Sequence, residues 1–386
     1  MKKKYSVLYI THYSELLGAN RSLLSLIILL RRRDIFFNPI VLLPRRGAIC
    51  EELDKLEVPY VICRFHASAY EKKNILDYVK GIIKELLNMF YSFFLYWIFR
   101  KKGINIVHTN SSVINIGIYL AWMLKIPHIW HFREFVIQHY HMNYNWGNSF
   151  EYFLYKKSYY IVLISKALLL YYLTVLKDKS NLKLVYNGIE LPKVSPQGAL
   201  YMEKFNIALV GVIHPSKHQD VVIKAIAKLV NVFNIRNLHL NILGNISHTV
   251  YYTSLLKLID ESNIKEYITF CGFVSDIGNS LKCSEIGILA SEYEAFGRVT
   301  VEYMLHGLVP VVSNSGANPE IIEDGVNGAI FQLNDVDDLA DKLRMLLTDN
   351  SLRKRMSLNA VDCAKANYTA DVNMDKIRTL YVDILK

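Results

Sequence analysis

Short runs of β-branched and other apolar residues alternate along the chain with longer segments whose apolar positions recur with a helical period. This alternation is typical of an α/β protein with parallel sheets. In the first half the predicted strands are Tyr5–Ile10, Ile40–Leu43, Tyr60–Cys63, Ile104–His108, His128–Trp130, Tyr160–Ile164 and Leu182–Val185. In the second half they are Ile207–Val212, His239–Leu243, Ile268–Cys271, Ile286–Leu289 and Val309–Val312. Helical patterns separate most strands, Arg21–Arg32 and Ile75–Phe99 among them.

A segment rich in Pro, Gly and Ser, Leu191 to Gly198, separates the two series of strands. The chain has 386 residues, enough for two domains of ~150 residues or slightly more. We therefore predict a first domain over 1–190, a linker over 191–202 and a second domain over 203–367. The segment 368–386 is expected to form a helix that packs back toward the first domain. Two doubly wound domains facing each other imply a cleft, with ligands beyond the carboxyl ends of the strands.

Composition excludes several classes of protein. Hydrophobic residues make up 52% and charged residues 21% of the chain, which excludes a disordered protein. The five cysteines are far apart, with no C-x-x-C pair, at positions Cys50, Cys63, Cys271, Cys283 and Cys363. This spacing argues against a disulfide framework or a zinc cluster and suits a reducing compartment. We expect a cytoplasmic protein with five small, buried or half-buried thiols.

The net charge of +10 is unevenly distributed. Residues 1–195 carry 27 Lys and Arg against 13 Asp and Glu, whereas residues 196–386 carry 18 against 22. A basic half could face nucleic acid, anionic lipid or phosphorylated substrates. The sequence has no zinc-finger spacing, RNP-like motif or basic heptad region, so nucleic acid is not expected as a partner.

One segment of the basic half has the composition of a membrane-surface helix. Seven of the eleven residues from Met89 to Phe99 are aromatic, Phe93, Phe94 and Trp97 among them. The longest strongly apolar run, Leu86 to Phe99, has fourteen residues, and a spanning helix needs ~20. Basic residues flank it at Lys72, Lys73, Lys80, Lys84 and Arg100-Lys101-Lys102. We expect docking on the anionic inner face of a membrane; the alternative is a helix packed under the first sheet.

Small-residue turns follow the first strand of each predicted domain. Gly18 lies in the turn between the first strand and its helix, where backbone N–H groups and the helix dipole could hold phosphate. The turn is not a G-x-G-x-x-G sequence, so a dehydrogenase-type nucleotide fold is not supported. In the second domain Lys217 follows Gly211 and could place an ammonium beside a phosphate. The alternatives are an ordinary turn and a solvated lysine.

The most informative segment runs from Ser291 to Gly307, between two predicted buried strands. Glu294 would lie in the loop above the first of these strands, and Glu302 about two turns into the following helix. A carboxylate pair accepts hydrogen bonds from the vicinal hydroxyls of a sugar or ribose. Phe296-Gly297 lets the backbone approach a ligand closely. Paired glutamates are also common on surface helices, so the spacing alone leaves that alternative open.

These segments together resemble the retaining glycosyltransferases of family 4. Glu294 and Glu302, with Phe-Gly between them and Gly307-x-Val-Pro-Val-Val after them, are similar to the family signature. The other matching segments, in chain order, are Gly18-Ala-Asn-Arg-Ser-Leu-Leu, His131-Phe-Arg-Glu134, Ser165-Lys-Ala, Tyr186-Asn-Gly-Ile189, Gly211 to Lys217 and Pro319 to Gly328. The resemblance covers nearly the whole chain and implies the GT-B fold, which has two Rossmann-like domains.

The resemblance also implies a role for each site residue. Glu302 would bind the ribose hydroxyls of a nucleotide sugar, Glu294 a hydroxyl of the donor sugar, and His131 would lie beside that sugar. The remaining donor-binding positions are the diphosphate contacts Gly18 and Lys217, the backbone at Phe296 and Gly297, Arg298, and Thr300 near the phosphates. His131 could instead be a core histidine. No metal or other cofactor is expected, and Asp335-Val-Asp337 is interpreted as a helix cap.

The chain departs from the family pattern at two positions. Val212 stands where the family usually has an arginine after the phosphate-turn glycine, so either Arg298 or Arg21 supplies that contact or the donor binds more weakly. Leu17 precedes Gly18 where the family often has a second glycine.

The predicted activity is transfer of a hexose, with retention, from a nucleotide diphosphate sugar. The predicted acceptor is a glycan or lipid-linked oligosaccharide of bacterial surface polysaccharide, such as capsule or O-antigen. The alternatives are a nucleotide-sugar epimerase of the same fold and a catalytically silent partner subunit.

Overall fold

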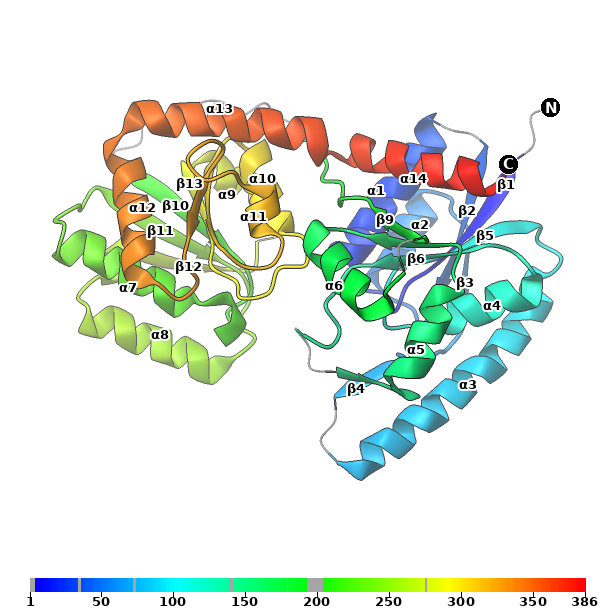
Figure 1. Cartoon of the computed structure of the whole chain (residues 1–386). Helices are drawn as coiled ribbons and strands as arrows, with labels where there is room; N and C mark the ends of the chain where they lie inside the picture. The colour runs from blue at the N-terminus through cyan, green and yellow to red at the C-terminus, as the bar shows by residue number, and fades with distance from the viewer. Residues whose placement is uncertain are drawn as a thin grey trace. The chain divides into compact units, whose positions relative to one another are not determined.

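A computed structural model of the chain describes residues 4–33, 36–71, 74–138, 142–178, 180–192, 204–274 and 276–386. By their contacts these residues form two units (Figure 1). Unit 1 contains the chain up to Gly188 together with Ala370–Lys386, and unit 2 contains Ile189–Thr369. From residue 193 on, the predicted linker lies outside the described residues.

Unit 1 is an α/β unit with helices between most of its strands. Its strands are β1 (Tyr5–Ile10), β2 (Phe37–Leu43), β3 (Tyr60–Ile62), β4 (Ala69–Glu71), β5 (Ile104–Thr109), β6 (His128–Phe132), β7 (Met142–Tyr144), β8 (Tyr160–Leu163) and β9 (Leu182–Leu184). Its helices are α1 (Gly18–Arg33), α2 (Ala48–Lys55), α3 (Ile75–Phe99), α4 (Ile116–Leu124), α5 (Gly147–Lys156), α6 (Lys166–Leu176) and α14 (Ala370–Ile384).

The main sheet of unit 1 is parallel, with strand order β3-β2-β1-β5-β6-β8-β9. Helices α1, α2 and α14 bury Ile27, Leu53 and Ile377 in the core on one face of this sheet. Helices α3 and α4 bury Leu95 and Leu120 in the core on the other face. The strand order reverses between β1 and β5, and ligands of doubly wound sheets bind beyond the strand ends at such a point.

Unit 2 repeats this plan. Its strands are β10 (Phe205–Val210), β11 (Leu238–Leu243), β12 (Ile268–Gly272), β13 (Ile286–Leu289), β14 (Val309–Ser313) and β15 (Ala329–Phe331). Its helices are α7 (Gln219–Asn231), α8 (Thr249–Glu261), α9 (Ile277–Lys282), α10 (Arg298–Leu305), α11 (Asn318–Ile321), α12 (Val336–Thr348) and α13 (Asn350–Asn367), with 3-10 turns at Pro215–Lys217 and Lys265–Tyr267.

The sheet of unit 2 is also parallel, with strand order β12-β11-β10-β13-β14-β15. Helices α7, α8 and α12 cover one face with Val222, Leu255 and Leu343. Leu281 of α9 and Tyr303 of α10 belong to the core on the other face. The order reverses between β10 and β13, so the segments that follow these two strands meet at the ligand-binding edge of the sheet.

The structure confirms the predicted fold class of two doubly wound, Rossmann-like units. Every predicted strand is present, and α3 has the predicted bounds. The prediction missed three strands of three residues each, β15 and the antiparallel pair β4–β7. Helix α1 begins at Gly18, earlier than predicted, and the Arg21 backbone N–H donates to the Leu17 carbonyl oxygen at 2.9 Å.

Candidate active site

The predicted donor-site residues of unit 2 gather where β10 and β13 end. Lys217 ends the 3-10 turn after β10, and Glu294 lies in the loop after β13. The Lys217 Nζ is 2.8 Å from Glu294 Oε1 and 3.1 Å from Ser291 Oγ. Both charged side chains are largely buried, so their attraction is screened less than that of a surface pair. The topology therefore joins two residues that lie 77 positions apart.

The backbone of Glu294 is fixed by the loop after β14. The Ala317 N–H donates to the Glu294 carbonyl oxygen at 2.8 Å. Gly316, with φ of +57°, lies so close that an added Cβ would be 2.3 Å from that oxygen. Only glycine fits this approach without displacing the loop. The carboxylate is consequently held in place from both its side chain and its main chain.

Helix α10 begins directly after this loop, at a glycine. Gly297 is its N-cap, with φ of +79° and no side chain to cap the first turn. A Cβ at this position would lie 3.1 Å from Asn318 Oδ1. The Phe296 ring is buried, 6.0 Å from the Tyr368 ring, so Phe296 can offer a ligand only its backbone. The positive end of the helix dipole here suits an anion.

The first turns of α10 carry a second ion pair. Arg298 Nε is 2.9 Å from Glu302 Oε1, one helical turn further on. Thr300 points the other way and is fully buried, with its Oγ1 3.4 Å from Asn318 Oδ1. Asn318 in turn donates from Nδ2 to the Ser313 carbonyl oxygen at 3.1 Å. The sequence analysis did not single out Asn318, which joins α10 to the end of β14.

Val212, where the family pattern has arginine, is 45% exposed and offers no charge. Of the two predicted substitutes, Arg298 is paired with Glu302, so its charge lies at the start of α10. Arg21 belongs to unit 1, where its Nε donates to the Leu16 carbonyl oxygen at 3.0 Å.

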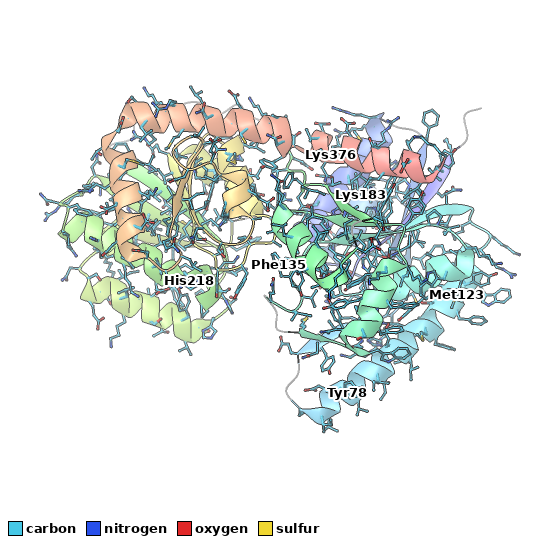
Figure 2. All side chains as sticks on the ribbon, in the orientation of Figure 1. Tyr78, Met123, Phe135, Lys183, His218 and Lys376 are labelled. Atoms are coloured by element: carbon cyan, nitrogen blue, oxygen red, sulfur yellow. The ribbon has the colours of Figure 1, made fainter. Side chains whose placement is uncertain are left out.

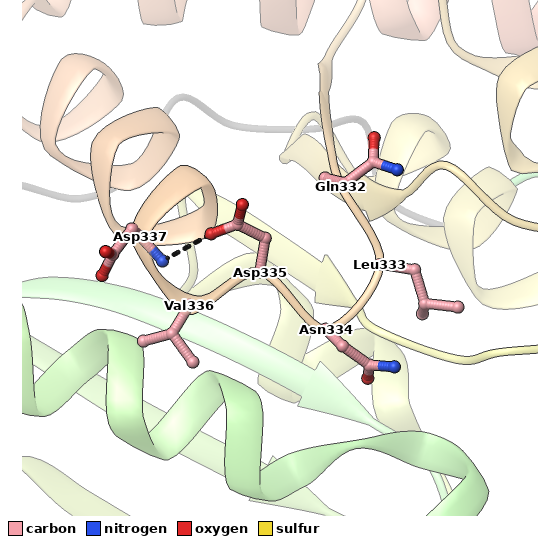
Figure 3. Close-up of a pocket in the computed structure, with 6 residues that line it drawn as sticks. All are labelled: Gln332, Leu333, Asn334, Asp335, Val336 and Asp337. Carbon is pink, nitrogen blue, oxygen red and sulfur yellow. Dashed lines mark hydrogen bonds between the residues drawn. The ribbon is translucent and has the colours of Figure 1, made fainter.

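The Asp335-Val-Asp337 sequence is a helix cap, as predicted. Asp335 Oδ1 accepts the backbone N–H of Asp337 at 2.9 Å, at the start of α12 (Figure 3). It also accepts the backbone N–H of Asp338 at 2.9 Å. The surface pocket around it is formed by the residues that lead into this helix, Gln332 to Asp337.

In unit 1, His131 lies at the carboxyl end of β6 and is almost completely buried. Its Nδ1 is 3.2 Å from His108 Nε2 and 3.4 Å from an Arg133 guanidinium nitrogen. Its Nε2 has no hydrogen-bond partner among the described residues. Burial first, and then the Arg133 guanidinium, hold the pKa of His131 and of His108 well below the ordinary value, so both rings are neutral.

A chain of hydrogen bonds continues from His131 to the C-terminal helix. His108 Nδ1 is 2.6 Å from the Tyr381 hydroxyl of α14. Because a guanidinium only donates, His131 Nδ1 acts as the acceptor and its proton lies on Nε2. His108 then donates from Nε2 and accepts at Nδ1 from Tyr381. The sequence analysis missed this partner because Tyr381 lies 273 positions after His108.

The loop that contains Gly18 is organised by a residue that the sequence analysis did not single out. Asn20 is fully buried and donates from Nδ2 to the carbonyl oxygens of Tyr13 and Glu15, at 3.0 and 2.8 Å. Gly18 itself has open space where a Cβ would be, and its φ is not left-handed. Packing inside unit 1 therefore does not require glycine at position 18. The absence of a side chain leaves room for a ligand to approach this backbone closely from outside.

The residues predicted to dock on a membrane lie on α3. Phe93, Phe94 and Trp97 are each about half exposed, at 53%, 55% and 49%. Within the part of the chain that the structure describes, α3 is also long and apolar enough to cross a membrane by length and composition. The prediction that this segment is too short to span a membrane was therefore wrong for the helix as a whole. Lys72 and Lys73 lie outside the described residues.

Two family models cover most of the chain. The model described as Glycosyltransferase Family 4 matches residues 18–193, and the model described as Glycosyl transferases group 1 matches residues 192–362. The chain belongs to the group 1 glycosyltransferases and has the GT-B fold. It is therefore a glycosyltransferase.

Solved structures and curated proteins agree with this assignment. The chain is similar to a glycosyltransferase from Rickettsia africae ESF-5, with a TM-score of 0.80, 21% identity and 99% of each chain covered. It is also similar to Anabaena HepE in complex with UDP, with a TM-score of 0.79, 19% identity and coverage of 98% of this chain and 100% of that one.

A UDP-Gal:alpha-D-GlcNAc-diphosphoundecaprenol alpha-1,3-galactosyltransferase of Escherichia coli is 25% identical, over 75% of this chain and 78% of its own. An N-acetyl-alpha-D-glucosaminyl L-malate synthase of Bacillus anthracis is 27% identical over 35% of each chain. The match to this second protein thus covers about a third of its length.

Proposed function

We propose that the protein transfers a hexose, with retention of configuration, from a nucleoside diphosphate sugar to a lipid-linked glycan during assembly of a bacterial surface polysaccharide such as capsule or O-antigen. The observation that carries this proposal is the pair of cation–carboxylate contacts at one edge of unit 2, Lys217–Glu294 and Arg298–Glu302. Such an arrangement offers carboxylates to hydroxyl groups and cations to phosphates within one small area.

In this proposal unit 2 holds the donor. Glu302 accepts hydrogen bonds from the ribose hydroxyls, and Glu294 accepts one from a hydroxyl of the sugar. Lys217 binds the diphosphate, and the backbone at Phe296 and Gly297 lines the sugar site. Thr300 holds the first turn of α10 in place beside the phosphates through its contact with Asn318.

The chemistry is a substitution at the anomeric carbon. Its bond to the β-phosphate oxygen breaks, a bond to the acceptor oxygen forms on the same face, and the acceptor proton passes to the departing diphosphate. Lys217, Arg298 and the start of α10 stabilise the charge that develops on this leaving group. These groups supply positive charge, so the proposal invokes neither a metal nor another cofactor.

The family resemblance assigns two residues of unit 1 to the same reaction. His131 presents its Nε2–H to the donor sugar, as a neutral hydrogen-bond donor that does not compete for a proton. Gly18 leaves its loop open to the diphosphate. The acceptor is then positioned for attack, and holding two reactants in the correct geometry supplies a large part of the rate of such a reaction.

Two relatives support the choice of donor and acceptor. HepE was solved with UDP and with UDP-glucose, which makes a uridine nucleotide the first donor to test. The name of the Escherichia coli relative specifies a sugar diphosphoundecaprenol as acceptor. The described cysteines are free thiols, which suits a cytoplasmic site of action, where we propose that the protein works at the inner face of the membrane.

The test combines donor turnover with product stereochemistry. The protein is incubated with a panel of nucleoside diphosphate sugars and a polyprenyl-diphosphate-linked sugar, and both nucleotide release and lipid labelling are measured. The expected result is release that depends on the acceptor, with an NMR coupling constant that shows the donor's anomeric configuration in the product. Interconversion of the sugar without acceptor would identify an epimerase. Absence of both donor binding and turnover across the panel would identify a silent partner subunit.

A further inference from the structure

Helix α3 has the reverse of the usual polarity, with polar side chains facing the inside of unit 1. A helix on the surface of a globular protein normally buries its apolar side. Here four of the six buried positions of α3 lack an apolar side chain, namely Gly81, Glu85, Asn88 and Ser92. Leu95 and Phe99, at the C-terminal end, are the buried apolar residues of α3, and the partly buried Tyr91, Tyr96 and Ile98 pack against the same core.

The polar inner side of α3 is matched by polar groups on the rest of unit 1. Glu85 accepts hydrogen bonds from the Tyr119 hydroxyl at 2.6 Å and from the amides of Asn115 and Asn145 at 3.1 Å each. Asn88 exchanges two hydrogen bonds with the backbone of His66, at 2.8 and 2.9 Å. These contacts fix the rotation of the helix about its axis, because a turned helix would leave buried polar groups unpaired.

The outer side of α3 is a continuous apolar strip. Nine of its side chains are between 47% and 73% exposed, and their spacing keeps them on one side of the helix: Ile75, Leu76, Val79, Ile83, Leu86, Phe90, Phe93, Phe94 and Trp97. Figure 1 shows α3 beside α4 at the edge of unit 1, with one long side uncovered by any other element. Helix α3 has 25 residues and is ~37 Å long. The strip extends along most of this length, so it is much larger than the single exposed apolar residues that are normal on protein surfaces.

Exposed apolar groups continue onto the neighbouring helices. Trp122 and Met123 at the end of α4 are exposed, and the Trp122 ring lies 6.5 Å from that of Phe153 on α5. Tyr78 on α3 and Met123 are labelled in Figure 2. The exposed apolar side chains therefore come from three neighbouring helices, α3, α4 and α5, and form one surface.

The charges around this surface are mainly positive. Residues 74–102 contain five basic and two acidic side chains, and one of the acidic ones, Glu85, is the buried group described above. Arg100, at the C-terminal end of α3, places its guanidinium 3.7 Å from the centre of the Trp97 ring. Lys157 lies 5.4 Å from the ring of Phe153. Aromatic rings and cations alternate in this way where a helix meets lipid headgroups.

We propose that the outer side of α3, with the ends of α4 and α5, lies in the interface of an anionic bilayer, parallel to the membrane plane. The inner side of α3 is committed to unit 1 by Glu85 and Asn88, so the helix cannot be surrounded by lipid, although its length would allow a span. A second protein copy would bring the same cations together, whereas an anionic headgroup layer neutralises them. The proposal does not depend on the reaction, because it needs no donor or acceptor.

The test is binding to vesicles in the absence of any nucleotide. The intact protein is sedimented with vesicles of phosphatidylcholine containing about 30% phosphatidylglycerol, in about 50 mM salt, where surface charges are weakly screened. We expect the wild type to sediment with these vesicles. The variant Phe93→Ser/Phe94→Ser/Trp97→Ser should bind at least about tenfold more weakly. Arg100→Ala/Lys101→Ala/Lys102→Ala should lose the preference for anionic over neutral vesicles.

A matched control changes three exposed apolar side chains of unit 2. Val232, Val250 and Leu358 are at least as exposed as the three aromatics, and their replacement by serine should leave vesicle binding unchanged. Equal loss in this control would overturn the assignment to α3. So would a wild type that stays in the supernatant, or a concentration-dependent dimer that the aromatic variant disperses. Wild-type protein that resists extraction by alkaline carbonate would indicate a spanning helix and would also contradict the proposal.

Depth is measured by quenching of tryptophan fluorescence by brominated lipid. We expect quenching in the wild type and a loss of most of it in Trp97→Phe/Trp122→Phe, which keeps aromatic groups at both exposed positions of the proposed surface. Quenching that is unchanged in this variant would show that another face of the molecule touches the bilayer. Because sugar transfer to a short soluble acceptor needs no bilayer, a failure here would leave the proposed transferase activity standing, and the reverse also holds.

Discussion

Replacement of Lys217 by alanine tests whether the donor diphosphate binds at the edge of unit 2. A hydrogen bond to a charged group contributes ~1.5–3 kcal/mol, or roughly a tenfold to 150-fold change in affinity. The Lys217 Nζ already lies 2.8 Å from Glu294 Oε1, so the single variant also leaves that carboxylate unpaired beside the phosphates. We therefore expect Lys217→Ala to weaken UDP binding toward the upper end of this range. Lys217→Ala/Glu294→Gln, which lacks the repulsion, should fall near the lower end.

Isothermal titration calorimetry with UDP measures both variants. Lys224→Ala is the matched control, because Lys224 also pairs with a carboxylate, Asp220, at 3.2 Å, but on an exposed part of α7. This control should leave UDP affinity unchanged. The reasoning is refuted if Lys217→Ala binds UDP as tightly as the wild type, or if the double variant is weaker than the single one. The first result would mean that Lys217 only positions Glu294.

Three further predictions concern the site and its support. Glu302→Ala should mainly weaken nucleotide binding, whereas Glu294→Gln should lower kcat more than it raises KM, as steady-state kinetics and calorimetry would show. Tyr381→Phe removes the hydroxyl that fixes His108 and should lower kcat several-fold, with nitrogen NMR reporting a mixed tautomer at His131; a single unchanged tautomer would contradict this. Burial raises the pKa of Glu151 in the folded protein well above its ordinary 4.5. The stability that this group contributes is therefore fully present below pH 4.5 and is lost as the pH rises toward the folded-state pKa. Urea unfolding should therefore show Glu151→Gln gaining stability relative to the wild type between about pH 5 and pH 8, and a constant difference would contradict it.

Residues whose structural role depends only on neighbours a few positions away were predictable from the sequence. Gly297 and Glu302 belong to one segment between two buried strands, where spacing and residue type already indicate a loop followed by a helix. The Asp335 cap was predictable for the same reason, because its hydrogen bonds reach only two and three residues along the chain. The contact between Lys217 and Glu294 was not predictable from spacing, since it depends on β10 and β13 being neighbours in the sheet.

The sequence by itself determined the two parallel sheets, the long helix α3 and the candidate carboxylates, because hydrophobic period and turn residues act over a few positions. Only the tertiary structure decided which side of each element faces inward. The aromatic residues of α3 suggest a lipid-facing helix equally well whether Glu85 points in or out, and the hydrogen bonds from Asn115, Tyr119 and Asn145 turn it inward. His108, the hydrogen-bond partner of His131, is likewise held by Tyr381, on a helix at the other end of the chain. Such pairings join residues far apart in sequence, and burial makes each unpaired polar group costly enough to fix them.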